Sequence, residues 1–173
     1  VKKSFLSICL FVLTVCLPAQ AAVEKPLEEP GTVTFVPPKN WRMVDAKQLK
    51  GNVRFMVIGK GKYEFPPSIN LSTEEYKGTL REYLAIVKEI NSSQGSEWKN
   101  LGMIKTEAGD ASLSQADAIT EWGPIRMMHV ILLRDDVIYI LTAASLKKEF
   151  PTLYQTFFKS FKSLKITNIA PHH

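Results

Sequence analysis

Residues 127–145 read MMHVILLRDDVIYILTAAS, two apolar runs separated by Asp135 and Asp136. Two such runs around a two-residue polar turn are typical of a β-hairpin. Because both runs are almost continuously apolar, they indicate central strands that are covered on both faces. The stretch therefore predicts a sheet with other structure packed on each side of it.

More strands are expected before this hairpin. Polar and apolar residues alternate over 32–36, with Val33 and Phe35 on the apolar face, and Pro37 and Pro38 end that strand because proline supplies no donor to a ladder. Trp41 is then expected to fold back and cover the core. A turn is expected at Gly123–Pro124. The other predicted strands cover residues 53–58, 68–72, 99–105, 111–122 and 125–133.

Two helices complete the predicted pattern. Residues 79–91 have helical periodicity, and Thr79 and Glu82 stand at the spacing of a capping box. A closing helix follows the hairpin, and 164–166 are expected to return as a short edge strand. The apolar stripe of this closing helix comprises Phe150, Leu153, Tyr154, Phe157, Phe158 and Phe161. The order of elements indicates an α+β domain with a mostly antiparallel sheet.

The first residues have the pattern of an export signal. Lys2 and Lys3 precede an apolar run over 5–17, and Ala19-Gln20-Ala21 is a small-x-small cleavage site. This pattern predicts a signal peptide over 1–21, cleavage near Ala21 and a periplasmic or secreted protein. The apolar run is shorter than the roughly 18 residues that a membrane-spanning helix needs.

An alternative is a lipoprotein modified at Cys16, although Val15 fits poorly before a lipidated cysteine. Cys9 and Cys16 are the only cysteines in the sequence, and both lie in the predicted signal peptide. The mature chain is therefore expected to form no disulfide and to use no thiol chemistry.

The remaining sequence is expected to form a flexible linker over 22–31, one domain over 32–167 and a C-terminal tail over 168–173. The chain has 22 basic and 17 acidic residues, and loss of Lys2 and Lys3 leaves 20 against 17. Nucleic-acid binding usually needs a continuous basic stripe. Because the basic residues here are scattered and the excess is small, no nucleic-acid partner is expected.

The order of several short motifs resembles the PsbP-like superfamily. An aromatic-x-Pro-x-x-Trp pattern ends the first strand, Ile-Asn-Leu follows a proline, Leu-x-x-Tyr-Leu opens a helix and Lys-Ser-Phe ends the last one. The matching residues are Phe35, Pro37 or Pro38, Trp41, Ile69, Asn70, Leu71, Leu80, Tyr83, Leu84, Lys159, Ser160 and Phe161. The likeness extends over 32–166.

This resemblance implies a twisted, mostly antiparallel sheet flanked by helices, an α-β-α sandwich. It also implies a non-enzymatic binding or assembly module without a cofactor, and the export signal agrees best with the bacterial envelope branch. Because the matched residues determine the fold alone, no site residue follows from the resemblance.

Residues 59–67 form the strongest candidate for a binding site. This loop is long and mixed in character, and core packing explains it poorly. It carries Lys60, Lys62, Tyr63 and Phe65, and we expect it to dock a partner, which would be another envelope protein. An anionic membrane surface is the alternative partner. Trp98 and Trp122 are candidates for the same surface as these aromatics. The simpler hypothesis is that each aromatic ring covers one end of the sheet.

A small hydrolase that uses His129 as a base is the competing hypothesis. Its candidate nucleophiles are Ser112, Ser114 and Ser145, and its candidate carboxylates are Asp135 and Asp136. No Gly-x-Ser-x-Gly motif is present, and a histidine between Met128 and Val130 is more typical of a structural role. No metal site is expected, because neither His172-His173 nor Asp135-Asp136 gathers the ligands that such a site needs.

Overall fold

The computed structural model describes residues 27–28 and 33–167. The predicted signal peptide and the predicted C-terminal tail lie outside these residues. So does most of the predicted linker.

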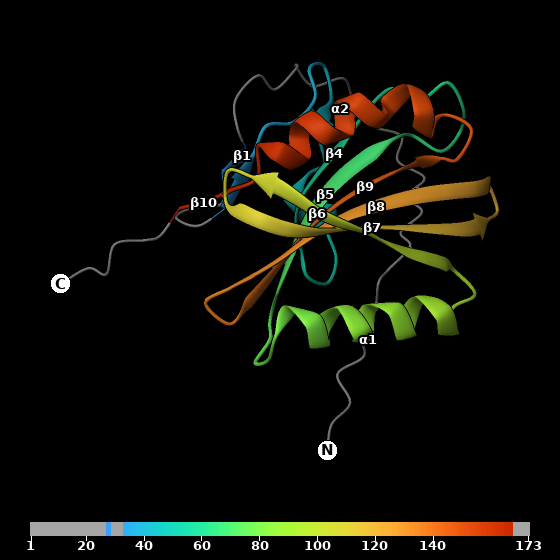
Figure 1. Cartoon of the computed structure of the whole chain (residues 1–173). Coiled ribbons are helices and arrows are strands. Elements are labelled where there is room, and N and C mark those ends of the chain that lie inside the picture. Colours follow the sequence, from blue (N-terminus) through green and yellow to red (C-terminus); the bar gives the residue numbers. More distant parts are fainter. Residues whose placement is uncertain (1–26, 29–32, 168–173) are drawn as a thin grey trace.

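Most of the described strands form one large sheet, and the helices α1 and α2 lie on either side of it (Figure 1). Their bounds are β1 Leu27–Glu28, β2 Val33–Phe35, β3 Arg42–Met43, a 3-10 helix at Ala46–Gln48, β4 Val53–Ile58, β5 Ser68–Glu75, α1 Leu80–Ser93, β6 Glu97–Thr106, β7 Gly109–Thr120, β8 Gly123–Arg134, β9 Val137–Leu146, α2 Phe150–Lys162 and β10 Lys165–Ile166.

The main sheet has seven antiparallel strands in the order β3-β4-β5-β9-β8-β7-β6, and β1, β2 and β10 form a second, small sheet. The predicted hairpin is confirmed as β8 and β9, which lie in the interior of the large sheet. Five consecutive residues of β8, from Met128 to Leu132, are buried. Continuous burial means that both faces of this strand are covered.

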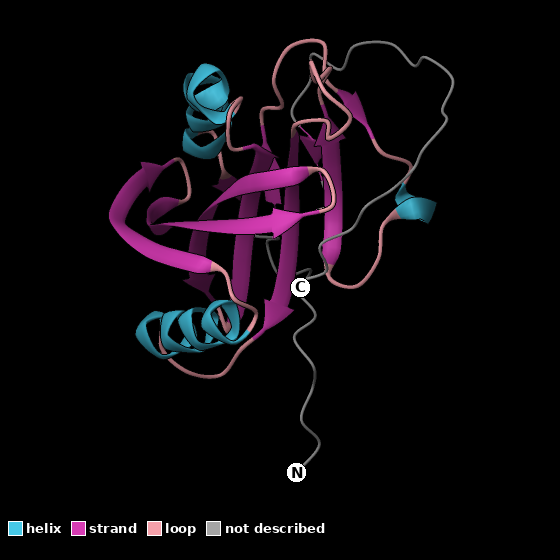
Figure 2. Ribbon diagram, turned by 90° about the vertical axis from the view of Figure 1, so that its right-hand side faces the viewer, coloured by secondary structure: helices cyan, strands magenta, loops and turns pink. Residues whose placement is uncertain are grey.

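The two helices provide that cover from opposite sides (Figures 1 and 2). α2 packs on the face that carries Met128, Val130 and Leu141, which belong to the larger core cluster with Phe157 and Phe161. α1 covers part of the other face, where a smaller cluster joins its apolar stripe to β8 and β9. That cluster contains Tyr83, Val87, Ile131 and Ile138. The α+β prediction of a twisted antiparallel sheet flanked by helices is confirmed.

Local chemistry explains how two of these elements begin and end. The capping box predicted for α1 is present, because the Thr79 hydroxyl accepts from the Glu82 N–H and the Glu82 carboxylate accepts from the Thr79 N–H. Asp135 and Asp136 have φ values of 52° and 57°. Positive φ at both central residues is what a type I′ hairpin turn requires.

The turn predicted at Gly123–Pro124 is wrong by two residues. Glu121 and Trp122 form the turn, while Gly123 and Pro124 already belong to β8. Pro124 is tolerated there because it is the second residue of the strand and β9 ends at Leu146, whose partner is Ile125. The displacement brings Trp122 to the tip of the β7–β8 hairpin.

The segment that follows β2 packs as the sequence predicts. Val33 and Phe35 are fully buried, and the Trp41 ring meets Phe157 of α2 edge to face, with 6.1 Å between the ring centroids. Trp41 therefore links the start of the described chain to the helix that closes it.

Candidate functional site

The loop at residues 59–67 connects β4 to β5 and is closed at its base. The Gly59 N–H donates to the Pro67 carbonyl at 2.8 Å. Gly59 also lies against the Trp41 ring, because a Cβ at this position would come within 2.5 Å of it. The core residue Trp41 thus fixes where the loop begins, and only glycine fits there without a shift of the ring.

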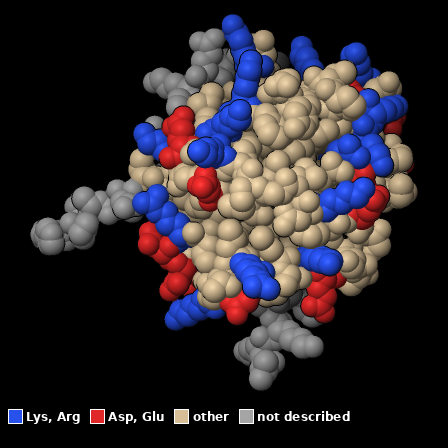
Figure 3. All heavy atoms as spheres, viewed as in Figure 1, with Lys and Arg blue, Asp and Glu red and all other residues tan. Residues whose placement is uncertain are grey.

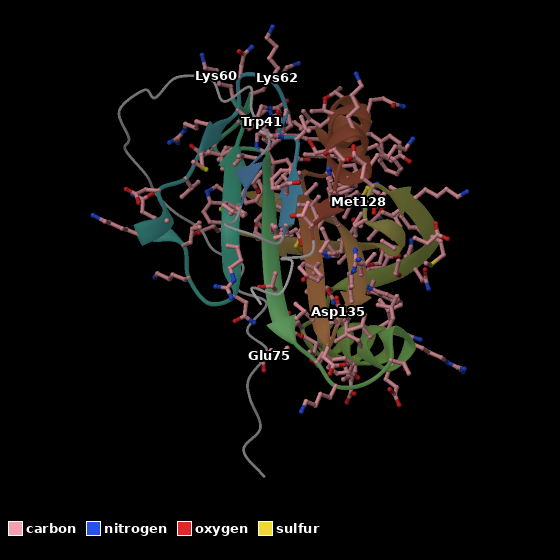
Figure 4. All side chains as sticks on the ribbon, turned by 90° about the vertical axis from the view of Figure 1, so that its left-hand side faces the viewer. Trp41, Lys60, Lys62, Glu75, Met128 and Asp135 are labelled. Carbon is pink, nitrogen blue, oxygen red and sulfur yellow. The ribbon has the colours of Figure 1, made fainter. Side chains whose placement is uncertain are left out.

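The structure places all four predicted binding residues in this loop. Lys60, Lys62 and Tyr63 are exposed, whereas Phe65 is half-buried. The Lys62 backbone N–H donates to Glu149 Oε1 at 3.0 Å, which ties the middle of the loop to the residue before α2. Figure 4 shows Lys60 and Lys62 at the end of the molecule opposite to Asp135.

An open groove of about 420 Å³ lies beside the loop. Its lining residues are Trp122, Pro124, Leu146, Lys147 and Lys148. The groove and the loop share two side-chain contacts. The Phe65 and Trp122 rings have centroids 5.8 Å apart, and Lys148 Nζ lies 3.3 Å from the centroid of the Tyr63 ring. The loop therefore forms one wall of the same surface.

Sequence reasoning missed the most exposed apolar side chain at this end of the sheet. Ile119 is 80% exposed, and its partner across the β7–β8 ladder is Pro124 of the groove. We define the loop-end surface as residues 59–67 together with Ile119, Trp122, Pro124, Leu146, Lys147 and Lys148. An apolar centre with charged residues around it is common at protein–protein contact surfaces.

The two groove lysines differ in their electrostatic surroundings. Lys147 Nζ lies 2.8 Å from Asp117, which also accepts two hydrogen bonds from the Arg126 guanidinium at 2.8 Å each. The Arg126 hydrogen bonds, helped by Lys147, lower the pKa of Asp117 to about 2. Lys148 forms no ion pair with any residue that the structure describes, and the same holds for Lys60 and Lys62.

The surface also carries acidic residues. Glu64 of the loop and Glu121 beside Trp122 are both exposed. On the face that Figure 3 shows, blue basic residues alternate with red acidic ones around a neutral centre, and no continuous basic stripe runs across it.

His129 lies in the middle of β8 and is buried. Its Nδ1 is 3.0 Å from the Thr142 hydroxyl oxygen of β9, and its neighbour on β7 is Ser114. Burial lowers the pKa of His129 to about 4. A neutral histidine held in a ladder of hydroxyl residues fits a structural role.

Of the other groups in the hydrolase hypothesis, Ser114 is the direct neighbour of His129 across the β7–β8 ladder, but the carboxylates lie elsewhere. Asp135 and Asp136 occupy the hairpin turn, and six residues of extended strand separate Asp135 from His129 by roughly 20 Å. Ser145 donates its hydroxyl proton to the Leu146 carbonyl. No serine, histidine and carboxylate converge among residues 33–167.

Trp98 does not belong with the other aromatics. It packs in the smaller core cluster with residues of α1, away from Trp122 and Phe65. The simpler hypothesis, that this ring covers part of the sheet, is therefore correct for Trp98. Trp122, in contrast, lines the groove.

The described residues were also compared with what a metal site and a membrane-spanning helix require. Among the residues that the structure describes, no group of three or more His, Cys, Asp or Glu side chains is placed to hold a metal ion. His172 and His173 lie outside those residues. Within the same described part of the chain, every helix is too short or too polar to cross a bilayer.

Three solved structures are similar to this chain over most of its length. The cyanobacterial PsbP (CyanoP) of Synechocystis sp. PCC 6803 has a TM-score of 0.59 and 13% identity, with 89% of this chain and 98% of that chain covered. LpqN, involved in cell envelope biogenesis of Mycobacterium tuberculosis, has a TM-score of 0.57 and 15% identity, with 86% and 92% covered. The Ran-binding protein Mog1p of Saccharomyces cerevisiae has a TM-score of 0.54 and 15% identity, with 86% and 97% covered.

These likenesses establish the fold. The chain has the PsbP-like fold that its sequence motifs indicate, a mostly antiparallel sheet with a helix on each side. No family model matches the sequence, and no curated protein matches it.

Proposed function

We propose that this protein is an exported, non-catalytic binding or assembly module of the bacterial cell envelope, and that it docks another envelope protein through its loop-end surface. The observation that carries the proposal is the continuity of the loop with the groove. Phe65 contacts Trp122 and Tyr63 contacts Lys148, so residues from three connections form one partly exposed apolar centre with charges at its edge.

A protein partner suits this surface better than a membrane does. Anionic lipid attracts unpaired lysines, each contributing about 1 kcal/mol near the surface. Glu64 belongs to the loop and Glu121 precedes Trp122, both are exposed, and an anionic bilayer would repel both carboxylates. A protein can place charges of either sign opposite a mixed rim.

The proposal that the protein is not a catalyst rests on the surroundings of His129. A general base must reach the proton that it removes, directly or through one water. His129 is buried between two strands and makes its hydrogen bond to Thr142. We therefore assign His129 a structural role, as a neutral side chain that is hydrogen-bonded inside the sheet.

The proposal of export rests on the sequence of residues 1–21 and on one similar solved structure. The name of LpqN places that protein in cell envelope biogenesis. We propose cleavage near Ala21, with lipidation at Cys16 as the alternative. N-terminal sequencing of the protein purified from its native envelope distinguishes the two, because a mature lipoprotein would begin with a blocked Cys16.

The docking proposal is tested by the same purification, carried out on two matched variants. Ile119→Asp places a charge at the apolar centre of the loop-end surface, and Ile86→Asp places one on α1, where the side chain is 40% exposed. We expect the co-purifying partner to be lost from Ile119→Asp and kept by wild type and Ile86→Asp. Equal recovery from both variants would contradict the proposal, provided that circular dichroism shows both to be folded.

A further inference from the structure

We infer that the partner docks through a segment that places one apolar side chain in the groove and one carboxylate on Lys148. This inference rests on the proposed function and names the chemistry of the segment that the loop-end surface recognises. It follows from the groove's lining, from the different pairing of its two lysines and from the acids around it.

The groove accepts an apolar side chain. Trp122, Pro124 and Leu146 provide carbon surface, and the hydrocarbon stems of Lys147 and Lys148 extend it. A volume of about 420 Å³ lies at the lower end of the ~300–1,000 Å³ range of small-ligand pockets. The space is sufficient for one large side chain of a peptide.

The two groove lysines differ in whether a carboxylate of the protein already contacts them. Lys147 lies 2.8 Å from Asp117, which it shares with Arg126. A second carboxylate therefore adds less at Lys147 than at an ammonium that has no such contact. Lys148 forms no ion pair with a described residue, so its ammonium group is the unpaired charge at the groove wall.

Tyr63 holds the Lys148 ammonium in place. Its ring centroid lies 3.3 Å from Nζ, within the range of a cation–π contact. An ammonium has three N–H donors, so contact with one ring face leaves donors for an incoming oxygen. Fixing the ammonium before binding lowers the entropic cost of the ion pair that the partner completes.

The acids at the surface limit how much negative charge a partner can bring. Glu64 of the loop and Glu121, the residue before Trp122, are exposed, whereas Glu149 is buried and accepts from the Lys62 N–H. A polyanionic segment would meet both exposed carboxylates at once. One carboxylate next to one apolar anchor satisfies Lys148 without that repulsion.

The test uses three capped dipeptides as probes against the 15N-labelled protein. They are N-acetyl-Phe-Glu-amide, N-acetyl-Phe-Gln-amide and N-acetyl-Ala-Glu-amide. The sequence has three tryptophans, so three indole N–H signals report on three places. Trp122 lines the groove, while Trp41 lies in the main core and Trp98 in the cluster under α1.

We expect N-acetyl-Phe-Glu-amide at millimolar concentration to shift the Trp122 indole signal and to leave those of Trp41 and Trp98 in place. Replacing Glu by Gln should weaken binding about two- to fivefold, the range of an exposed ion pair. Replacing Phe by Ala should weaken it further, because the apolar anchor is lost.

Lys148→Gln should bind the Phe-Glu and Phe-Gln probes equally, and Lys88→Gln on α1 should keep the wild-type difference. Equal binding of both probes by the wild type would overturn the inference, as would a Trp122 signal that no probe shifts. Salt-sensitive binding to vesicles of phosphatidylcholine with phosphatidylglycerol, abolished by Trp122→Ser, would also overturn it in favour of a lipid surface.

The two proposals can fail separately. If Ile119→Asp loses its envelope partner while the dipeptides leave the Trp122 signal unchanged, the docking surface stands and the recognised chemistry is different. If Ile119→Asp keeps the partner, the docking site itself is wrong.

Discussion

Single residues determine where the candidate surface lies and how stable its scaffold is. Trp41 and Gly59 illustrate this, because the ring that fills the core leaves room only for a glycine at the start of the loop. The sequence predicted a buried Trp41, since the residue follows an alternating strand and two prolines. It did not predict the contact with Gly59, which joins the residue before β3 to the residue after β4.

The exposed Ile119 could not be predicted at this scale either. It lies in an alternating segment, where an isoleucine is normally expected to face the core. Its position two residues before the turn, at a sheet end that no helix covers, leaves it 80% exposed. Exposure here depends on what packs over the strand end, and this is a property of the whole fold.

His129 should make stability depend on pH. Its pKa is lowered by burial from the ordinary 6.5 to about 4. The unfolded chain therefore binds more protons than the folded chain between these values, so stability is complete above pH 6.5 and falls as pH decreases toward 4. The loss at pH 4 is on the order of 3 kcal/mol.

Urea unfolding of wild type and His129→Gln between pH 7.5 and pH 4 measures this dependence. We expect the variant to be less stable at pH 7.5 and to lose much less stability than wild type between pH 6.5 and pH 4.5. Parallel pH profiles for the two proteins would show that His129 is not the titrating group.

At the scale of elements, the sequence was most informative where local chemistry acts alone. The Thr79 and Glu82 capping box and the Asp135-Asp136 turn both form as predicted, because each depends on residues within one short segment. The turn at Glu121 and Trp122 was displaced from its prediction, since Gly123–Pro124 is a turn signal in isolation. In the sheet, the early end of β9 removes the usual obstacle to a proline at the start of β8.

The β8–β9 turn offers a stabilising substitution. Asp136 has a φ of 57°, a left-handed conformation that costs a side chain energy and costs glycine almost none. Asp136→Gly should raise the free energy of unfolding by up to about 1 kcal/mol. The Tyr76 N–H to Asp136 carbonyl hydrogen bond is made by the backbone and should survive.

Thermal or urea unfolding of Asp136→Gly measures the effect. Asp110→Gly is the matched control, because Asp110 does not have a left-handed φ and the change should destabilise β7. A destabilised Asp136→Gly would contradict the assignment of a type I′ turn.

At the scale of the whole molecule, the sequence motifs indicated the PsbP-like fold. They indicated no site, and only the loop residues of the candidate surface were predicted from the sequence. Lys60, Lys62, Tyr63 and Phe65 were predicted as a binding loop because core packing did not account for them. Trp122, Pro124, Leu146 and Lys148 come from the β7–β8 turn, from the strand ends of β8 and β9 and from the segment after β9, and the sheet order brings them to the same end. Such a juxtaposition has no local signal in the sequence.

The most direct test of the docking surface is site-specific photo-cross-linking in intact cells. A photoreactive benzoylphenylalanine replaces Tyr63, which is 48% exposed in the loop, or Tyr154, which is 40% exposed on α2. We predict a discrete protein adduct from position 63 that Trp122→Ser abolishes, and none from position 154. An adduct from position 154 alone, or one from position 63 that persists in Trp122→Ser, would contradict docking at the loop-end surface.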